Sequence, residues 1–360
     1  MKQKRALSLL LFFFVCTLSV RSQEKTFPID GIVLDKSGQP LVGASVFCQN
    51  TTVGTLSKND GGFHLRLANG GYDLVVSYTG YETQVIRISK DHLATDTFRV
   101  QLKEQDKSLE QAVVTGSAEV ADGWDKYGQF FLDNFIGTTP NAAHCTLDNK
   151  EVLKFYFYKK RNKLRIKATD PLVVTNNALG YRIRYQLDSF VFDYGGNIGS
   201  YTGYPLFESL DGSPDQQSDW KKNRLYSYAG SRLHFIRSWY DSTLDDEGYV
   251  LELADSGSSK MRKLEDPYDA KLYSRDSGDV QVNIQGRLRV SYTSRVPDKK
   301  YLLQNKYPLT TPAQISALDI ANGFVIEENG YFYDQGDVSN IGYWAWKKLA
   351  ELLPYDYLPE

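Results

Sequence analysis

Histidines are the first residues to test for chemistry, because zinc hydrolases hold their metal through histidine and carboxylate side chains and leave one position for water. A His-x-x-Glu pair followed by a later histidine would supply such ligands. The chain has four histidines, at positions 64, 92, 144 and 234. None of them begins a His-x-x-Glu or a His-x-x-x-His motif. The sequence therefore predicts no metal site and no cofactor.

Other catalytic patterns are equally weak. His144 precedes Cys145, but neighbours on a strand point to opposite faces, so a cysteine–histidine pair is not expected. The acidic run 241–248 has Asp246 where a calcium loop needs glycine, which favours a solvated loop over a loose calcium site. Nothing selects a glycosidase pair among the 44 acidic residues. We predict no catalytic residue.

Aromatic residues stand out instead, with 25 Tyr, 18 Phe and 5 Trp. Several of them gather in a middle segment rich in turn residues, and they form the candidate interaction surface: Tyr201, Tyr204, Trp220, Tyr226 and Tyr228. Tyrosine and tryptophan bury a large area while keeping a polar tip, so they are favoured at binding surfaces. The same side chains also fill β-sheet cores. Both interpretations stay open at this point.

The elements before this segment are short strands separated by glycine and asparagine corners, with no helical period. Strands are predicted over 29–35, 44–49, 52–57, 63–67, 72–78, 83–88 and 98–102. Seven short strands at this spacing predict a small β-sandwich over 24–103. Its core candidates alternate with polar neighbours; they are Val33, Val46, Phe63, Leu65, Leu74, Val76 and Ile86.

The same segment resembles a known family. The residues that carry the resemblance are Gly31, Val33, Asp35, Gly38, Pro40-Leu41, Gly43-Ala44, Val46, Gly54-Thr55, Gly61, Phe63, Ser77-Tyr78 and Gly80-Tyr81. In this order they resemble the carboxypeptidase regulatory-like domain, a transthyretin-like sandwich common in Gram-negative envelope proteins. Lys58 stands where the family usually has Asp. The resemblance implies an accessory domain without peptidase activity.

A charged linker is predicted over 104–124 and a larger, antiparallel β-rich module of unknown function over 125–360, so the fold class is mainly β. Strands are expected over 154–158, 163–168, 181–192, 232–240, 280–292 and 324–333. Short helices are expected near 125–136, 312–319 and 341–353. Segments such as "YAGSRLHFIRS" resemble the uncharacterised downstream part of secreted proteins that begin with this domain. No activity is implied by that resemblance.

The first 22 residues have a basic start, an apolar run of about a dozen residues and small residues near the exit, which predicts a secretory signal peptide. Removing them leaves 38 basic residues against 44 acidic ones, a net charge near −6. Nucleic acid is therefore not an expected partner, because it requires a basic face. Cys48 and Cys145 lie in different predicted modules, so two separate thiols are favoured over a disulfide.

Together these observations predict a non-enzymatic, secreted protein of the Gram-negative envelope. It would act as a binding or scaffolding module in the periplasm or at the outer membrane, with an envelope protein or a glycan as partner. No transmembrane helix is expected after signal cleavage. Two alternatives stay open: a small outer-membrane barrel of eight strands after residue 150, and a hydrolase with an unrecognised site.

Overall fold

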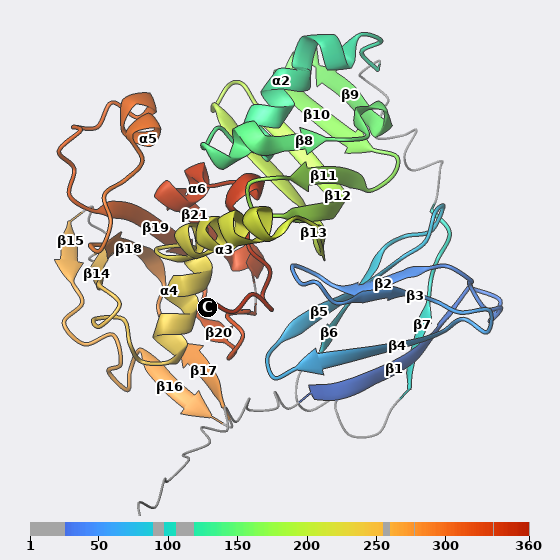
Figure 1. The fold of residues 1–360 in the computed structure, drawn as a ribbon, viewed down its shortest axis with the longest axis horizontal. Helices are drawn as coiled ribbons and strands as arrows, with labels where there is room; N and C mark the ends of the chain where they lie inside the picture. Colours follow the sequence, from blue (N-terminus) through green and yellow to red (C-terminus); the bar gives the residue numbers. More distant parts are fainter. Residues whose placement is uncertain are drawn as a thin grey trace, which may run out of the picture.

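The computed structural model describes residues 26–88, 97–105, 119–254, 260–276, 278–333 and 335–359. These residues form a mainly β structure in three regions, each with its own core (Figure 1), which confirms the predicted fold class. The predicted signal peptide and residues 106–118 of the predicted linker lie outside the described residues. No helix formed by the described residues has the length and apolar character needed to cross a bilayer.

The first region is the predicted sandwich. Its strands are β1 (Thr26–Leu34), β2 (Ser45–Cys48), β3 (Gly54–Leu56), β4 (Gly62–Ala68), β5 (Tyr72–Ser77), β6 (Gln84–Ile88) and β7 (Phe98–Gln101). They form two sheets in the orders β4-β1-β7 and β3-β2-β5-β6. Each strand coincides with a predicted one. Six of the seven predicted core side chains are buried and Ile86 packs at the edge of the same core, because alternate strand residues face the inside of a sandwich.

The second region is a six-stranded sheet covered by one helix. Its strands are β8 (Cys145–Leu147), β9 (Leu153–Tyr158), β10 (Lys163–Ala168), β11 (Leu172–Asn176), β12 (Tyr181–Asp193) and β13 (Ile198–Ser209). Strand β12 pairs with β13 on one side and with β11 and β10 on the other. Helix α2 (Gly123–Phe135) places Phe131 and Phe135 in the core. The helix predicted near 125–136 is thus present.

The third region combines two sheets. Strands β14 (Tyr249–Ala254), β15 (Met261–Lys263), β18 (Gly286–Tyr292), β19 (Gln314–Ile320) and β21 (Val338–Gly342) form a five-stranded sheet in the order β15-β14-β18-β19-β21. Strands β16 (Tyr273–Asp276), β17 (Asp279–Val282) and β20 (Phe324–Ile326) form a smaller one. The remaining α-helices are α3 (Pro214–Tyr228), α4 (Arg232–Tyr240), α5 (Lys299–Gln304) and α6 (Tyr343–Trp346). Short 3-10 helices are η2 (Asn141–His144), η3 (Lys150–Val152), η4 (Lys159–Arg161), η5 (Gln335–Asp337) and η6 (Leu349–Glu351).

Several predictions for this part of the chain are wrong. The strand predicted over 232–240 is helix α4, which begins at the cap Ser231, whose hydroxyl accepts from the His234 N–H. The helix predicted near 312–319 is strand β19, which pairs with β18 on one side and with β21 on the other. The helix predicted over 341–353 is interrupted, since only α6 and η6 are helical there.

Strand pairing corrects two further expectations. The strand predicted over 280–292 is divided into β17 and β18, which belong to different sheets. The alternative of one closed eight-stranded sheet after residue 150 is wrong, because the described strands fall into three separate open sheets. Helices pack on these sheets and cover their apolar faces.

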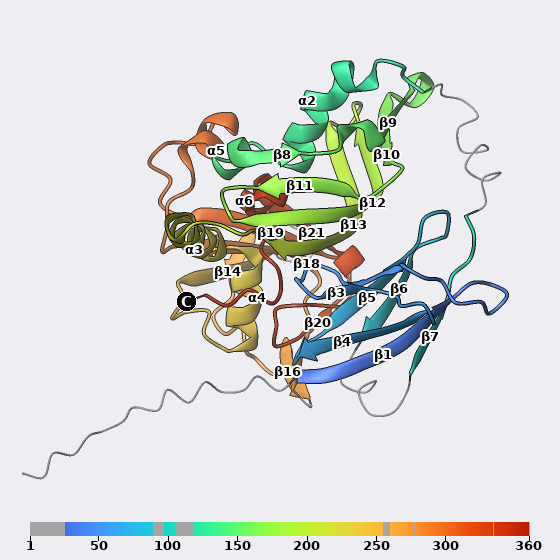
Figure 2. The same ribbon diagram turned by 45° about the vertical axis from the view of Figure 1, so that its right-hand side comes forward.

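The sandwich lies against the other two regions, with its β2–β3 turn toward β13 (Figures 1 and 2). The Asn50 N–H donates to the Pro205 carbonyl at 2.6 Å, and the Phe207 N–H donates to the Thr51 carbonyl at 2.9 Å. On the opposite side of the turn, the Tyr355 N–H donates to the Asn50 carbonyl at 2.7 Å. The turn is therefore inserted between β13 and the segment around Tyr355.

A second contact joins β5 to the hairpin after β20. The Tyr331 hydroxyl donates to Asp73 Oδ1 at 2.8 Å, and the Asn329 side chain donates to the Gly71 carbonyl at 3.0 Å. A Cβ atom at Gly71 would lie 2.5 Å from the Tyr331 ring. Only glycine permits this close approach, so Gly71 is needed for the contact with Tyr331 as well as for the turn.

Candidate binding groove

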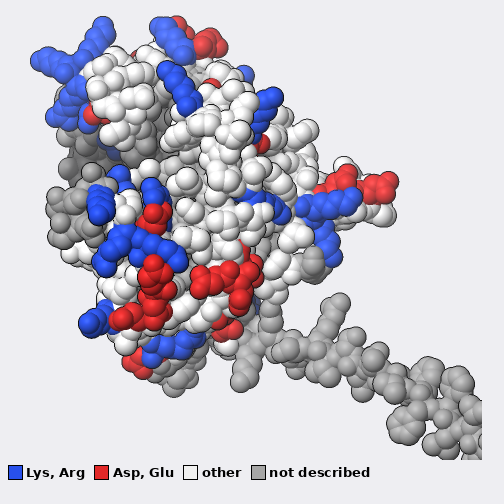
Figure 3. Space-filling model, turned by 90° about the vertical axis from the view of Figure 1, so that its left-hand side faces the viewer, with Lys and Arg blue, Asp and Glu red and all other residues white. Residues whose placement is uncertain are grey.

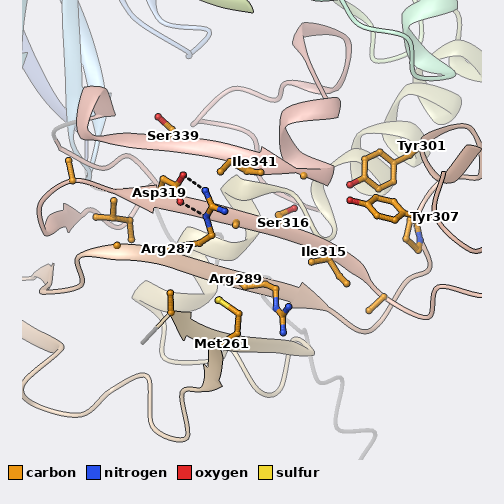
Figure 4. A pocket seen from close by; sticks show the side chains of 18 of the residues that line it. Met261, Arg287, Arg289, Tyr301, Tyr307, Ile315, Ser316, Asp319, Ser339 and Ile341 are labelled. Carbon is orange, nitrogen blue, oxygen red and sulfur yellow. Dashed lines mark hydrogen bonds and ion pairs between the residues drawn. The ribbon is translucent and has the colours of Figure 1, made fainter. Parts of the chain in front are cut away.

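The outer face of the five-stranded sheet, opposite α4, forms a groove of about 860 Å³ (Figure 4). Strand β18 positions its residues by simple alternation: Leu288 and Val290 are buried in the core, whereas Arg287 and Arg289 line the groove. Strand β19 does the same with Ala317 and other groove residues. One face of each strand therefore builds the core and the other the groove.

Two ion pairs fix the charged side chains of the groove floor. Arg287 donates from Nε and one Nη to the two oxygens of Asp319, both at 2.7 Å, across the β18–β19 pairing. Arg289 donates from Nε to Glu252 Oε2 at 2.6 Å across the β14–β18 pairing. The hydrogen bonds from Arg287 lower the pKa of Asp319. These bidentate pairs hold charged, planar groups in fixed orientations.

Apolar and aromatic side chains form the remainder of the groove. Ile315 on β19 and Ile341 on β21 are exposed at its surface. Tyr301 and Tyr307 close one end, with ring centroids 5.8 Å apart and hydroxyls directed toward the groove (Figure 4). Ala317, which has a small side chain, also lines the groove. The groove thus offers an apolar strip beside oriented polar groups.

The chemistry of this site follows from its paired charges. Asp319 is held ionised by Arg287, so it is a poor proton donor at neutral pH. In the part of the chain that the structure describes, no three or more His, Cys, Asp or Glu side chains are grouped to hold a metal ion. A concave surface with a few oriented polar groups is typical of a ligand site.

The five residues of the predicted interaction surface do not share one exposed surface. Trp220 and Tyr228 are buried, 5% and 8% exposed, and the Trp220 indole donates to the Asn177 carbonyl at 2.7 Å. Tyr228 packs against the His234 ring at 4.8 Å between centroids. These two side chains are core residues of α3.

The other three residues differ among themselves. Tyr201 on β13 is half-buried and packs edge-to-face against Phe135, with ring centroids 5.2 Å apart. Burial raises the pKa of Tyr201 to about 12. Tyr204 is half-buried on the same strand, and burial raises its pKa as well. Tyr226 on α3 is exposed, with 54% of its surface accessible. Of the five, Tyr226 alone is exposed, and Tyr201 and Tyr204 are partly accessible.

The groove residues were missed from the sequence, although "GRLRVSY" and "QISALDI" alternate with period two and could have indicated a second, exposed sheet face. A buried histidine was missed too. His234 Nε2 lies 3.1 Å from Glu247 Oε2, and Nδ1 lies 2.9 Å from the Tyr249 hydroxyl. Burial lowers the pKa of His234. Its contacts link α4 to β14, a structural role.

Both cysteines of the described chain are free thiols, as predicted. Cys48 is buried in the sandwich, and Cys145 lies at the start of β8. Burial raises the pKa of Cys145 to about 12. A thiol with so high a pKa is a poor nucleophile, which agrees with the structural role expected for Cys145.

Solved structures share little with the whole chain. Catechol 1,2-dioxygenase from Pseudomonas arvilla C-1 is 12% identical, with a TM-score of 0.20, over 24% of this chain and 55% of that one. A DUF3823 family protein from Parabacteroides merdae is 11% identical, with a TM-score of 0.17, over 54% of this chain and 84% of that one. TM-scores this low establish neither a shared fold nor a shared function.

Sequence relatives match the sandwich. TonB-dependent receptor SusC from Bacteroides thetaiotaomicron is 33% identical over 103 residues, 29% of this chain and 10% of the receptor. TonB-dependent receptor P39 from Formosa agariphila is 29% identical over 113 residues, 31% of this chain and 10% of the receptor. The match thus spans a tenth of the length of these relatives. The CarboxypepD_reg-like domain model matches residues 29–114. The seven-stranded sandwich therefore lies in the part of the chain that matches this family model.

Proposed function

We propose that the protein is a non-enzymatic protein of the Gram-negative envelope that acts as a binding or scaffolding module facing the periplasm. The family of its first domain and the similarity of that domain to TonB-dependent receptors support an envelope setting. The predicted signal peptide agrees with export. The partner would be an envelope protein or a glycan.

The observation that carries the proposal is the groove on the outer sheet face. It exposes Ile315 and Ile341 beside the ion pairs of Arg287 and Arg289. An apolar strip gives affinity when it is covered, and side chains already fixed by ion pairs lose little freedom on binding. This combination suits recognition better than reaction, because the charged groups are already neutralised by one another.

Photo-crosslinking in cells tests the proposal. A photoreactive residue at Ile341 or Ser339 would lie in the groove. One at Leu56 or Ile198 would be even more exposed than one at Ile341, but on strands of the other two regions. We expect the groove positions to give a discrete adduct with an envelope component. Mass spectrometry and glycosidase treatment then distinguish a protein from a glycan.

The control positions decide the result. If groove and control positions give the same adducts, or if neither gives any, the groove is not a binding site and the proposal is wrong. Substituting Ile315 by Lys in the crosslinking protein should remove the adduct without altering expression, because Ile315 is 42% exposed.

A further inference from the structure

Exposed apolar side chains concentrate in one segment, residues 295–311, which we call the arm. The described residues include thirteen large, exposed apolar side chains, and four of them lie between positions 296 and 309. They are Val296, Leu303, Tyr307 and Leu309, each more than half exposed. Single exposed apolar residues are ordinary, but a group of them marks a surface that binds a protein or a membrane.

The arm is held rigidly from its inner side. It contains α5 and projects from the upper left of the molecule in Figure 1. Tyr301 and Leu302 are buried, and the Tyr301 ring packs 5.0 Å from Tyr343 and 5.6 Å from Trp346. The Trp346 indole also donates to the Gln304 side chain at 2.7 Å. The outward side chains are therefore presented on a fixed support.

The outward side of the arm is basic. Lys299, Lys300 and Lys306 are all exposed, whereas Asp298 is the one acidic residue between positions 295 and 311. Asp298 caps α5 by accepting from the Lys300 N–H at 2.7 Å. The chain as a whole has a net charge of −2. The positive charge of the arm is therefore local.

Basic and exposed apolar side chains lie close together in the arm. On α5, Leu303 follows Lys299 by one turn, so the two share a face of the helix. Figure 3 faces this side of the molecule and shows uncharged side chains filling most of the area between the charged ones. Lysines interleaved with exposed leucines fit the boundary of a lipid bilayer, where the ammonium groups meet phosphates and the apolar groups enter the acyl region.

We propose that the arm docks the protein on an anionic lipid surface. Leu303 and Leu309 would enter the headgroup region, and the lysines would contact lipid phosphates. A two-fold dimer through the arm would bring the lysines of both copies together, whereas an anionic lipid surface carries the complementary charge, so we favour lipid as the occupant. This inference does not depend on the groove. Tyr226 extends the same surface, because the Arg295 guanidinium lies 4.6 Å from its ring centroid at the base of the arm.

Sedimentation with lipid vesicles tests the apolar part. The mature protein should bind vesicles of phosphatidylcholine mixed with phosphatidylglycerol more tightly than phosphatidylcholine alone. The variant Val296→Ser/Leu303→Ser/Leu309→Ser should lose binding by at least tenfold. Leu56→Ser/Ile198→Ser, equally exposed elsewhere, should bind like the wild type. Equal loss in both variants, or no binding of the wild type, would overturn the proposal.

The charged part has its own variants. Lys299→Gln/Lys300→Gln/Lys306→Gln should weaken binding by roughly 100-fold, at about fivefold per lysine near the surface, and salt should have the same effect. Lys36→Gln/Lys58→Gln, exposed on the sandwich, should leave binding unchanged. Light scattering tests whether a second copy of the protein occupies the arm instead. If the wild type is a dimer that the triple serine variant dissociates, and the wild type does not bind vesicles, the arm is a dimer interface and lipid docking is refuted.

Discussion

Replacing Tyr331 by Phe tests the hydrogen bond that joins the third region to the sandwich. The Tyr331 side chain is 1% exposed, and its hydroxyl donates to Asp73 Oδ1 at 2.8 Å. Phenylalanine keeps the ring contacts with Tyr333 and Tyr355, whose centroids lie at 5.3 and 5.8 Å. The substitution thus removes the hydroxyl alone. Because a hydrogen bond to a charged group contributes about 1.5–3 kcal/mol, we expect a loss of that size at pH 7.

The loss should depend on pH. Burial raises the pKa of Asp73, and the Tyr331 hydrogen bond opposes that rise. A raised pKa means that the folded protein holds this proton more tightly than the unfolded chain does. The contribution of Asp73 to stability therefore falls as pH rises from its ordinary value of 3.8 toward the folded pKa. Without the hydroxyl the folded pKa rises further, so the deficit of the variant should be larger at pH 7 than near pH 4.

Urea unfolding followed by circular dichroism measures both effects. Tyr226→Phe is the matched control, because this tyrosine is exposed and should change stability by less than about 0.5 kcal/mol. If Tyr331→Phe costs no more than the control, or if its cost is the same at both pH values, the hydrogen bond to Asp73 does not stabilise the contact.

Three further predictions concern other parts of the molecule. Residues 24–103 expressed alone should unfold cooperatively as a β protein without bound metal; stoichiometric zinc would contradict this. Thiol titration of the unfolded, unreduced mature protein should find two thiols, Cys48 and Cys145, and finding none would show a disulfide. Trp220→Ala should lower the free energy of unfolding by about 3–5 kcal/mol, whereas Tyr226→Ala should change it by less than about 0.5 kcal/mol. Denaturant midpoints of the two variants measure this difference, and equal effects would refute the burial of Trp220.

The sandwich could be predicted strand by strand because its signals are local. Polar and apolar residues alternate along β4, from Gly62 to Ala68, and the Asn-Asp-Gly-Gly corner before it requires backbone angles that glycine adopts readily. The local alternation and the adjacent turn are enough to predict such a strand. Tertiary contacts confirm these elements without altering them.

Secondary structure in the second half of the chain is harder to predict, because helices that are buried on all sides show no amphipathic period. Helix α4 is buried from His234 to Tyr240, so its sequence shows no polar face, and its aromatic content resembles a strand. Helix α3 was missed for the opposite reason, because most of its residues are polar. Its Ser213 capping box with Gln216 and its Pro214 were present as a start signal. The residues after this start signal are polar on most faces of the helix, so they form no apolar stripe that would predict a helix.

The groove could not be located from the sequence because it arises from pairing between strands that are distant along the chain. Ile315 reaches the surface beside Ile341 only because β19 pairs with β21. An exposed isoleucine and a core isoleucine look the same in a sequence. What distinguishes them is which face of the sheet a helix covers, and that depends on the position of α4.

The turn at Asn50 constrains the order in which the protein folds. The strands of the sandwich all lie between residues 26 and 101, so they pair over shorter sequence separations and can assemble earlier. The contact between Thr52 and Asp356 joins residues 304 positions apart, and it forms only after both flanking regions are in place. Long separations slow folding. Until that step the backbone groups of the turn stay unpaired, and an unpaired edge invites pairing with other chains. We expect this late step of folding to be the one at which the protein is most prone to aggregation.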